Sequence, residues 1–294
     1  MTTGRIVCVG HVMVDVAAQL PGPLAAGSDT PAQIDIRHGG SAANTAAWVA
    51  SLGVPSMFVG RVGDDEFGRA AVDALRAQRV TTAVTIDPTA STGMCIVLVA
   101  PDGERTMIPS AGANSHLSEA DLPTLDGTDR LHVSGYALLD DGSQSAALAA
   151  IDSAVRAGAA VSVDAASAAP LRRFGPTEFR RLLPASTLLV ANADEATALT
   201  GLLSPTAAAG ALAEQFDTVV VKRGGTGAVA VISGAVYDVP GVAASVRDST
   251  GAGDAFAAGL LAALRAGADL ATAVTQAHRL GAVAVSQLGA RPLG

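Results

Sequence analysis

Aromatic and charged side chains are both scarce in this sequence of 294 residues. Phe, Trp and Tyr together make up 3% of the chain, and Asp, Glu, Lys and Arg make up 16%, well below the usual share of about a quarter for charged residues. Hydrophobic residues nevertheless reach 49%, which excludes an intrinsically disordered chain. We therefore expect a large core of Ala, Val and Leu, in which helices pack closely against a sheet.

Positive charge is also in short supply, and lysines and arginines form no cluster. The formal net charge is −8, from 27 acidic and 19 basic residues, so no nucleic-acid partner is expected. Such a chain can still bind ATP, because backbone N–H groups and a metal ion hold phosphates locally. The charge balance therefore disfavours nucleic acid without disfavouring a nucleotide.

Cysteine is rare, and long apolar runs are missing. The two cysteines, Cys8 and Cys95, lie in apolar, strand-like segments. We expect two reduced core thiols and a cytoplasmic protein. The apolar run near the N-terminus ends at Gly10; it is too short for a membrane span and lacks the layout of a signal peptide. No membrane partner is expected.

Hydrophobic periodicity predicts an α/β protein. After a first buried strand at 5–10, most of the regular alternation lies beyond residue 130. Strand-like runs there alternate with helix-like runs, which predicts a mainly parallel sheet covered by helices on both faces. The runs are strands at 131–135, 160–164, 187–191 and 218–222, helices at 143–157, 177–183 and 194–200, an antiparallel insert at 228–239, and closing helices at 252–266 and 269–286.

The first half of the chain contains hairpin-like segments. Residues 81–87 and 92–99 alternate or run apolar, and a turn at residues 102 and 103 separates them from 104–109, which is typical of β-hairpins. Segments 12–38 and 89–110 are distant in sequence, but we expect them to join as one small β-sheet, a lid projecting from the main domain. Residues 1–294 would then form a single domain with this lid.

The segment DSTGAGDAFAAGLL, residues 248–261, joins a glycine-containing polar turn to a long apolar helix. Gly251 and Gly253 allow the backbone to approach a ligand, and the amides of residues 251–253 would lie at a helix N-terminus, where they favour an anion. Asp254 follows on the first turn. Amides that stabilise a moving phosphoryl group, beside a carboxylate that accepts a proton, suit phosphoryl transfer. A plain glycine-rich turn with Asp at a helix start is the alternative, and spacing alone leaves both open.

A second glycine-rich segment, HGGSAANTAA at residues 38–47, also precedes a helix. Gly39 and Gly40 permit close backbone contact with a small polar ligand. Asn44 lies about one turn into the helix and faces the same place. Ser41 is expected to be the N-cap of this helix. The alternative is a tight turn with Asn44 on the helix surface.

Two further positions carry candidate polar groups. Asp15 follows the first strand at its carboxyl end, where ligands of open α/β sheets bind, and its carboxylate could hold sugar hydroxyls; the alternative is a solvated loop Asp. Asn192 and Glu195, three residues apart in NADEA, share a helix face and could organise magnesium-bound water near a phosphate. A capping box explains the same pair, and both interpretations are compatible.

The segment VKRGGTGA, residues 221–228, could cradle a nucleotide, although β-hairpins also begin in this way. Its spacing is not that of a P-loop, which needs Gly-x-x-x-x-Gly-Lys-Ser/Thr. No dinucleotide-binding fingerprint follows the first strand either, so a nicotinamide-dependent oxidoreductase is disfavoured.

Taken together and in this order, these segments resemble the PfkB/ribokinase family of carbohydrate and nucleoside kinases over nearly the whole chain, Gly10 to Gly289. The most specific part is the pair of signatures GGSAANTAA and DSTGAGDAF. The resemblance implies a three-layer α/β/α domain with a mainly parallel sheet and a small β-sheet lid. It also implies an ATP-dependent kinase, assisted by Mg²⁺, that phosphorylates a hydroxyl, in particular a primary alcohol, of a small sugar.

The resemblance also implies roles for individual residues. Asp254 matches the catalytic base, and the amides of Gly251, Ala252 and Gly253 match the anion hole. The positions that match the family's substrate site are Asp15, Gly39, Gly40 and Asn44. Those that match its nucleotide and magnesium sites are Asn192, Glu195, Lys222, Gly224, Gly227 and His278. Those that match the potassium site of the ribokinase branch are Asp248 and Thr250, with the backbone near Ala284, Gln287 and Gly289.

Several residues depart from the ribokinase pattern. Met13 stands where ribokinases often have Asn, Ser41 stands where they have Lys, and Tyr136 or a neighbour replaces their Glu. Arg223 occupies a position in the nucleotide loop that is usually apolar. These departures argue against ribose, and Met13 and Tyr136 would suit a nucleoside or a bulkier or deoxygenated sugar.

The same residues leave two alternative functions open and suggest a second copy of the chain as a partner. A nucleoside kinase of the adenosine or pseudouridine type would use the same chemistry. A non-catalytic regulator that binds a sugar or nucleotide is the alternative from another class, against which the intact Asp254 and its glycines argue. Low charge content and exposed lid strands favour a homodimer paired through the lid.

Overall fold

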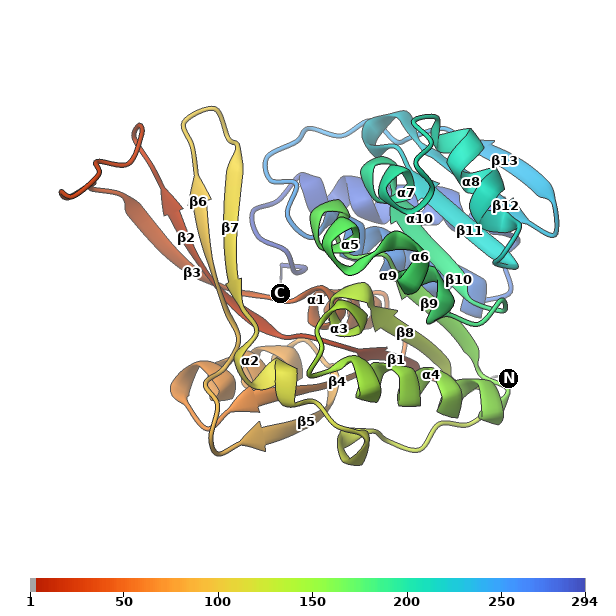
Figure 1. Ribbon diagram of the computed structural model, residues 1–294, viewed down its shortest axis with the longest axis horizontal. Coiled ribbons are helices and arrows are strands. Elements are labelled where there is room, and N and C mark those ends of the chain that lie inside the picture. Colours follow the sequence, from red (N-terminus) through yellow and green to blue (C-terminus); the bar gives the residue numbers. More distant parts are fainter. Residues whose placement is uncertain (1–3, 294) are drawn as a thin grey trace.

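The computed structural model describes residues 4–293, which form a three-layer α/β/α domain with a second, smaller sheet at one side (Figure 1). Residues 1–3 and 294, which the sequence prediction places in the same domain, lie outside the described residues. The predicted fold class, a mainly parallel sheet between helices with a small β-sheet lid, is confirmed.

The main sheet has nine strands in the order β13-β12-β11-β10-β9-β8-β1-β4-β5. Neighbours from β11 to β5 are parallel, and β12 and β13 are antiparallel to the strands beside them. The bounds are β1 Ile6–Val9, β4 Ser56–Gly63, β5 Thr81–Asp87, β8 Arg130–Ser134, β9 Ala160–Asp164, β10 Leu188–Asn192, β11 Thr218–Lys222, β12 Ala228–Ile232 and β13 Ala235–Val239.

Helices cover both faces of this sheet because its central strands are apolar on both sides. In β1, Val7 and Val9 face one core while Ile6 and Cys8 face the other. The first core lies under α3 (Gly135–Leu139), α4 (Gln144–Ala157), α5 (Ala168–Phe174), α6 (Pro176–Arg181), α7 (Ala193–Thr200) and α8 (Pro205–Ala213). The second lies under α1 (Ser41–Ser51), α2 (Glu66–Ala77), α9 (Ala252–Arg265) and α10 (Leu270–Val285).

The lid is a four-stranded sheet in the order β3-β2-β6-β7, with β2 at Met13–Gln19, β3 at Gln33–Gly39, β6 at Met94–Val99 and β7 at Arg105–Ser110. Its two halves come from distant parts of the chain and are joined by the parallel pair β2–β6. Side chains alternate between its faces. Ile36, Ile96 and Ile108 share the outer face through their pairing, whereas Arg37 and Arg105 extend from the inner face toward the main domain.

Two local expectations were wrong. The predicted hairpin at 92–99 and 104–109 is present as the antiparallel pair β6–β7, but residues 81–87 are not part of it; they form β5, which pairs in parallel with β4 at the edge of the main sheet. An edge strand is half-exposed, which explains its alternating pattern. Ser41 is not the N-cap of α1, because Gly40 takes that position with φ of 94° and the hydroxyl of Ser41 bonds elsewhere.

Other elements lie outside the expectation or extend it. Helices α3, α5 and α8 have no counterpart in the sequence prediction, and the antiparallel pair β12–β13 extends the main sheet. Cys8 and Cys95 are both free and buried, as expected. Within residues 4–293 no single helix has the length and hydropathy to span a membrane, although the bent pair α7–α8 meets the same criteria together.

Candidate active site

Three polar side chains end three adjacent strands of the main sheet. Asp164 ends β9, Asn192 ends β10 and Lys222 ends β11, and the pairing register keeps them close. The Lys222 Nζ atom lies 3.0 Å from Asp164 Oδ2. Ligands of open α/β sheets bind at this carboxyl edge. Asp164 was missed by the sequence reasoning, although its place at the end of a predicted strand could have indicated it.

The turn before α9 presents a helix N-terminus to this edge. Gly251 has φ of 75°, and a Cβ atom there would lie 2.3 Å from the Ala290 carbonyl oxygen, so the turn itself requires glycine. At Gly253 the nearest atom to such a Cβ would be the flexible Lys222 Nζ, at 3.3 Å. No described side chain caps this helix. The Ala252 amide bonds weakly to Ser249 O, at 3.3 Å, so the first-turn amides point to a space where an anion fits.

Asp254, on the first turn of α9, is held by two donors from α1. Ser41 Oγ donates to its Oδ1 and Asn44 Nδ2 donates to its Oδ2, each at 2.8 Å. Burial raises the pKa of Asp254 to about 6, although these two hydrogen bonds favour the ionised form. The structure thus brings the two glycine-rich signatures together and places an oriented carboxylate of raised pKa beside the helix N-terminus.

A buried arginine, Arg291, supports this arrangement and was missed by the sequence reasoning. Its Nε donates to Asn44 Oδ1 at 3.1 Å and its Nη2 donates to the Gly39 carbonyl at 3.0 Å. It therefore fixes which end of the Asn44 amide faces Asp254. Burial lowers the pKa of Arg291 to about 10, against the opposing charges of Asp15 and Asp254. Nothing in the C-terminal sequence marks this lone arginine as part of a motif.

Asp15 lies on the lid strand β2, above the glycine pair. A Cβ atom on Gly39 would lie 2.2 Å from Asp15 Oδ2, and one on Gly40 would lie 2.4 Å from the His11 carbonyl oxygen. Glycine is therefore required at Gly40, where backbone meets backbone at a positive φ, whereas at Gly39 the close atoms belong to the flexible Asp15 side chain. Burial raises the pKa of Asp15 to about 6, opposed by the charges of Arg291 and Arg37. Met13 lies two residues before Asp15 on β2, and its sulfur is 3.4 Å from the side-chain nitrogen Nδ2 of Asn114.

Asn192 and Glu195 form the predicted capping box at the start of α7. Asn192 Oδ1 accepts from the Glu195 amide at 2.9 Å, and Glu195 Oε2 accepts from the Asn192 amide at 2.7 Å. Burial and the negative charge of Asp164 raise the pKa of Glu195 to about 7, with Lys222 opposing. The cluster therefore carries more carboxylate charge than Lys222 neutralises, which favours an added cation.

The side chains around Glu195 fit a magnesium ion whose other ligands are water and the phosphates of a substrate. Among the described residues no group of three or more His, Cys, Asp or Glu side chains could hold a metal by itself. Magnesium usually keeps its waters and takes one or two carboxylates together with substrate phosphates. Glu195 is one buried glutamate, and its capping-box partner Asn192 lines the adjoining cavity, which fits that pattern.

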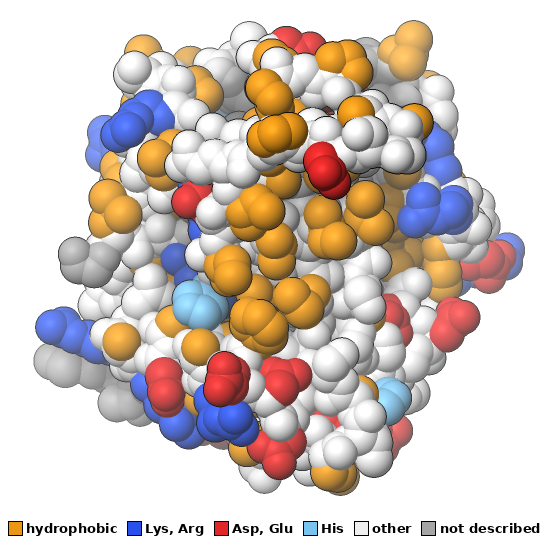
Figure 2. Space-filling view, turned by 90° about the vertical axis from the view of Figure 1, so that its left-hand side faces the viewer, with side chains coloured by type: hydrophobic (Ala, Val, Ile, Leu, Met, Phe, Trp, Pro, Cys, Tyr) orange, Lys and Arg blue, Asp and Glu red, His pale blue; other side chains and the backbone are white. Residues whose placement is uncertain are grey.

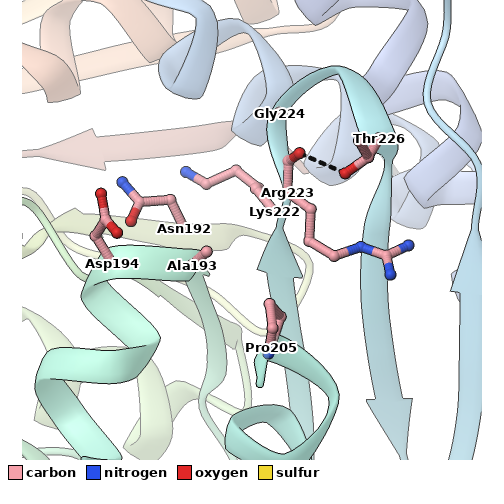
Figure 3. A pocket seen from close by; sticks show the side chains of 8 residues that line it. All are labelled: Asn192, Ala193, Asp194, Pro205, Lys222, Arg223, Gly224 and Thr226. Carbon is pink, nitrogen blue, oxygen red and sulfur yellow. Dashed lines mark hydrogen bonds between the residues drawn. The ribbon is translucent and has the colours of Figure 1, made fainter. Parts of the chain in front are cut away.

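A cavity of about 370 Å³ opens next to this cluster (Figure 3). It is lined by Asn192, Ala193, Asp194, Pro205, Lys222, Arg223, Gly224 and Thr226. Figure 3 shows Lys222 directed toward Asn192 while Arg223 turns the opposite way, where it pairs with Asp238 of β13. The side chain of Arg223 therefore leaves the cavity open.

Three residues of the predicted nucleotide and magnesium sites do not line this cavity: Glu195, which is buried in the capping box, Gly227 and His278. Gly227 has φ of 114°, and a Cβ atom there would lie 2.1 Å from the Val239 carbonyl oxygen, so the β12–β13 edge explains this glycine. His278 on α10 packs its ring edge-on to Phe256, with centroids 5.0 Å apart. Burial lowers the pKa of His278 and keeps the ring neutral. Gly224, at φ of 59°, does line the cavity.

Tyr136 is the second residue of α3, which begins at Gly135 directly after strand β8, and it is 38% exposed. Burial, and then the nearby negative charges of Asp164 and Glu195, raise the pKa of Tyr136 to about 12. The ring therefore borders the same carboxyl edge as the acidic cluster, on the side of α3, and it can offer a flat surface to a ligand.

The residues expected to hold a monovalent cation are engaged with protein groups. Asp248 Oδ1 is 2.7 Å from Arg105 Nη2, Asp248 Oδ2 is 3.4 Å from Arg37 Nη1, and Thr250 Oγ1 accepts from Arg105 Nη1. The Gly289 amide donates to Asp248 Oδ2, the Ala284 carbonyl accepts from the Gln287 amide, and Gln287 Nε2 donates to Arg291 O. Burial favours the neutral form of Asp248, but the hydrogen bonds from Thr250, Gly289 and Arg105 lower its pKa to about 2. This donor set does not fit a monovalent cation.

Known proteins resemble this chain over nearly its whole length. Residues 3–293 match the model of the pfkB family carbohydrate kinases. A probable fructokinase-7 of Arabidopsis thaliana is 31% identical, over 98% of this chain and 88% of the relative.

Solved structures of sugar and nucleoside kinases share the fold. An adenosine kinase of Sinorhizobium meliloti superposes with a TM-score of 0.89 at 26% identity, covering 99% of this chain and 97% of the other. A fructokinase of Vibrio cholerae O395, in its fructose-, ADP- and calcium-bound form, superposes with a TM-score of 0.83 at 29% identity, covering 99% and 95%.

Proposed function

The chain belongs to the pfkB family of carbohydrate kinases, and on that premise we propose that it transfers the γ-phosphoryl group of ATP to a primary hydroxyl of a small sugar. The observation that supports this most strongly is Asp254, held on both oxygens by Ser41 and Asn44 at the uncapped N-terminus of α9. An oriented carboxylate beside unpaired amides is the arrangement that phosphoryl transfer to an alcohol requires.

In the proposed reaction Asp254 accepts the proton of the substrate hydroxyl as its oxygen attacks the γ-phosphorus and the bond to the leaving ADP oxygen breaks. The first-turn amides of α9, at Gly251, Ala252 and Gly253, stabilise the charge that spreads over the phosphoryl oxygens. Lys222 lies against the same turn, 3.3 Å from the position a Gly253 Cβ would take. Its ammonium group therefore adds positive charge where negative charge develops.

The nucleotide is proposed to occupy the cavity along Asn192, Lys222 and Gly224. Mg²⁺ would arrive with it and supply charge neutralisation and polarisation of the phosphoryl oxygens. Asn192 and Glu195 are the side chains that would hold this ion, through water. The raised pKa of Glu195, caused by burial and by Asp164, agrees with a site that gains from added positive charge.

The acceptor sugar is proposed to lie between the lid and α1, near Asp15, the glycine pair and Asn44. Asp15 places a carboxylate of the lid's inner face close to Gly39, and a carboxylate can accept hydrogen bonds from sugar hydroxyls. Burial raises its pKa to about 6 even though the charges of Arg291 and Arg37 lower it, so a hydroxyl that donates to this carboxylate would further favour the ionised form.

A nucleoside is the second candidate acceptor, and two side chains favour it. Met13 is apolar where a polar contact to a sugar would be useful, and Tyr136, which is 38% exposed, borders the site with an aromatic ring. A base that stacks on an aromatic ring and contacts a thioether would use both. The similarity to a solved adenosine kinase supports the same candidate.

We also propose that the protein forms a homodimer through its lids. The outer face of the lid carries Ile34, Ile36, Ile96 and Ile108, each about half or more exposed at 61%, 60%, 48% and 52%. Four exposed isoleucines on one sheet face favour association, and a second copy of this chain supplies the complementary face.

The experiment that tests the proposed function is ADP release, measured by a coupled assay, across a panel of sugars and nucleosides with Mg²⁺ and ATP. Saturable, acceptor-dependent release with at least one sugar is the expected result. A preference for nucleosides over every sugar would move the assignment to the second candidate. Binding of sugar or nucleotide without any phosphoryl transfer would instead favour a non-catalytic regulator.

A further inference from the structure

Two arginines of the lid meet one buried carboxylate of the main domain. Arg37 comes from the edge strand β3 and Arg105 from the opposite edge strand β7, and both reach Asp248, whose side chain is 5% exposed. The contact of Arg105 is the closer, at 2.7 Å against 3.4 Å. Arg105 also donates to the Thr250 hydroxyl, so one planar guanidinium bridges both side chains of the turn that precedes α9.

Asp248 organises that turn through its other contacts. It accepts from the Thr250 amide at 2.9 Å and from the Gly289 amide at 3.0 Å. The turn it holds continues into Gly251, which packs on Ala290. A buried carboxylate in this position needs a positive partner, since leaving it unpaired is costly. The partner can be a bound cation or a guanidinium group, and here the guanidinium of Arg105 holds the position.

We propose that Arg105 replaces a monovalent cation in this protein, so that lid closure itself supplies the charge that orders the anion-binding turn at the start of α9. Arg105 is a positioning residue: it touches Asp248 and Thr250, and it acts on the reaction through the Gly251–Gly253 amides. Arg37 forms a longer ion pair with the same carboxylate, at 3.4 Å. It also pairs with Asp35 at 3.5 Å, so its interaction with Asp248 is the weaker of the two arginine contacts.

The consequence is an enzyme that needs no potassium. Because the lid must be closed for Arg105 to reach Asp248, the turn is ordered when the acceptor is enclosed and loosens when the lid opens. This inference rests on the proposed kinase function for its kinetic part, and its binding part can be tested separately.

The kinetic test compares the chain with its Arg105→Ala and Arg105→Lys variants in potassium chloride and in tetramethylammonium chloride at equal ionic strength. The unaltered chain should have the same kcat/KM in both salts. Arg105→Ala should lose roughly tenfold or more in tetramethylammonium and recover most of it in potassium or with added guanidinium. In tetramethylammonium the kcat/KM of Arg105→Lys should lie between those of the unaltered chain and Arg105→Ala, since an ammonium group keeps the positive charge but lacks the paired donors of a guanidinium.

Arg76→Ala is the matched control. Arg76 also contacts one threonine and one aspartate, Thr82 and Asp73, but on the exposed surface of α2. Its removal should leave kcat/KM unchanged in either salt. Potassium activation of the unaltered chain would overturn the inference, and so would an Arg105→Ala variant that behaves like the unaltered chain or that stays slow in both salts and with guanidinium.

The binding test uses thermal unfolding in the same two salts and needs no turnover. The unaltered chain should unfold at the same temperature in both. Arg105→Ala should unfold at a higher temperature in potassium than in tetramethylammonium, because the ion takes the vacated place beside Asp248. If no acceptor of the panel is phosphorylated, this shift still decides the inference, and its absence would contradict it.

Discussion

At the scale of single residues, the candidate site depends on opposing influences on Asp254. Burial favours the protonated acid, whereas the donors Ser41 and Asn44 favour the carboxylate. The balance leaves a pKa of about 6, close to the value at which a carboxylate is ionised at neutral pH yet basic enough to accept a proton. The hydroxyl of Ser41, expected to cap a helix, instead donates to Asp254 and lowers the pKa of that carboxyl group.

Turnover should fall as the pH drops through about 6, because protonated Asp254 cannot accept the acceptor's proton. Ser41→Ala removes a donor that stabilises the ionised form, so it raises the pKa of Asp254 and moves the acid limb of the kcat/KM profile to higher pH. The measurement is kcat/KM from pH 5 to 9, about the range over which such a limb is visible.

The control for this shift is Ser51→Ala, at the other end of α1, where the hydroxyl bonds only to the Trp48 carbonyl among the described groups. Its acid limb should stay in place. Glu195 also titrates nearby, with a pKa of about 7. An unshifted limb in Ser41→Ala would therefore assign the limb to Glu195 or another group and contradict the role given to Asp254.

At the scale of helices and strands, α9 is placed by close contact with α10. A Cβ atom on Gly259 of α9 would lie 2.9 Å from the Ala277 Cα and 3.2 Å from the Gln276 carbonyl oxygen. Backbone meets backbone there, so neither helix can yield by turning a side chain. The small residues of α9 thus fix the position of the helix that carries Asp254.

Gly259→Ala should lower the free energy of unfolding by about 1–3 kcal/mol, because the added methyl overpacks the α9–α10 contact. Gly281→Ala on α10 is the matched control, since its Cβ would meet its nearest neighbour at an ordinary 3.7 Å. That change should stabilise by about 0.5–1 kcal/mol through helix propensity. Urea unfolding of both variants measures the difference, and equal midpoints would show that the close approach carries no cost.

Sequence reasoning placed most strands of the main sheet because a buried parallel strand contains a short apolar run, as in 188–191 and 219–221. It misplaced β5 because an edge strand and a hairpin share the same alternation. It missed short helices such as α3 and α5, which are stabilised by packing on neighbours more than by a periodic pattern of their own.

At the scale of the whole molecule, the lid has two different faces. Its inner face sends Asp15, Arg37 and Arg105 toward the main domain. Its outer face gathers isoleucines, and Figure 2, viewed from the lid side of the molecule, shows apolar side chains grouped across it. The same small sheet therefore has a role in closing the site and a surface suited to a second copy of the chain.

Sedimentation velocity at micromolar concentration should show a dimer. Ile36→Lys places a charge in the outer face and should shift the distribution to monomer. Leu203→Lys is the control, because Leu203 is 87% exposed and lies in the α7–α8 connection, away from the lid. A monomer of the unaltered chain, or dissociation by Leu203→Lys as well, would contradict lid pairing.

The candidate site could be predicted from sequence as far as its motifs reach. Glycine-rich turns before helices are local signals, so Gly251 to Asp254 and Gly39 to Asn44 were identified as parts of one site. The supporting contacts could not be found in this way. Arg291 meets Asn44 from 247 residues away, and Arg105 meets Asp248 from 143 residues away. Such pairs are set by the fold alone, and neither arginine lies in a motif.

The central claim, that Asp254 is the base of a phosphotransferase, is tested most directly by the turnover of Asp254→Asn. The amide keeps the size of the side chain but cannot accept the proton, so kcat should fall roughly 10²–10⁴-fold while acceptor affinity, measured by calorimetry, changes little. Asp152→Asn, an exposed acid on α4, should leave kcat unchanged. Turnover of Asp254→Asn near that of the unaltered chain, at unchanged affinity, would contradict the account.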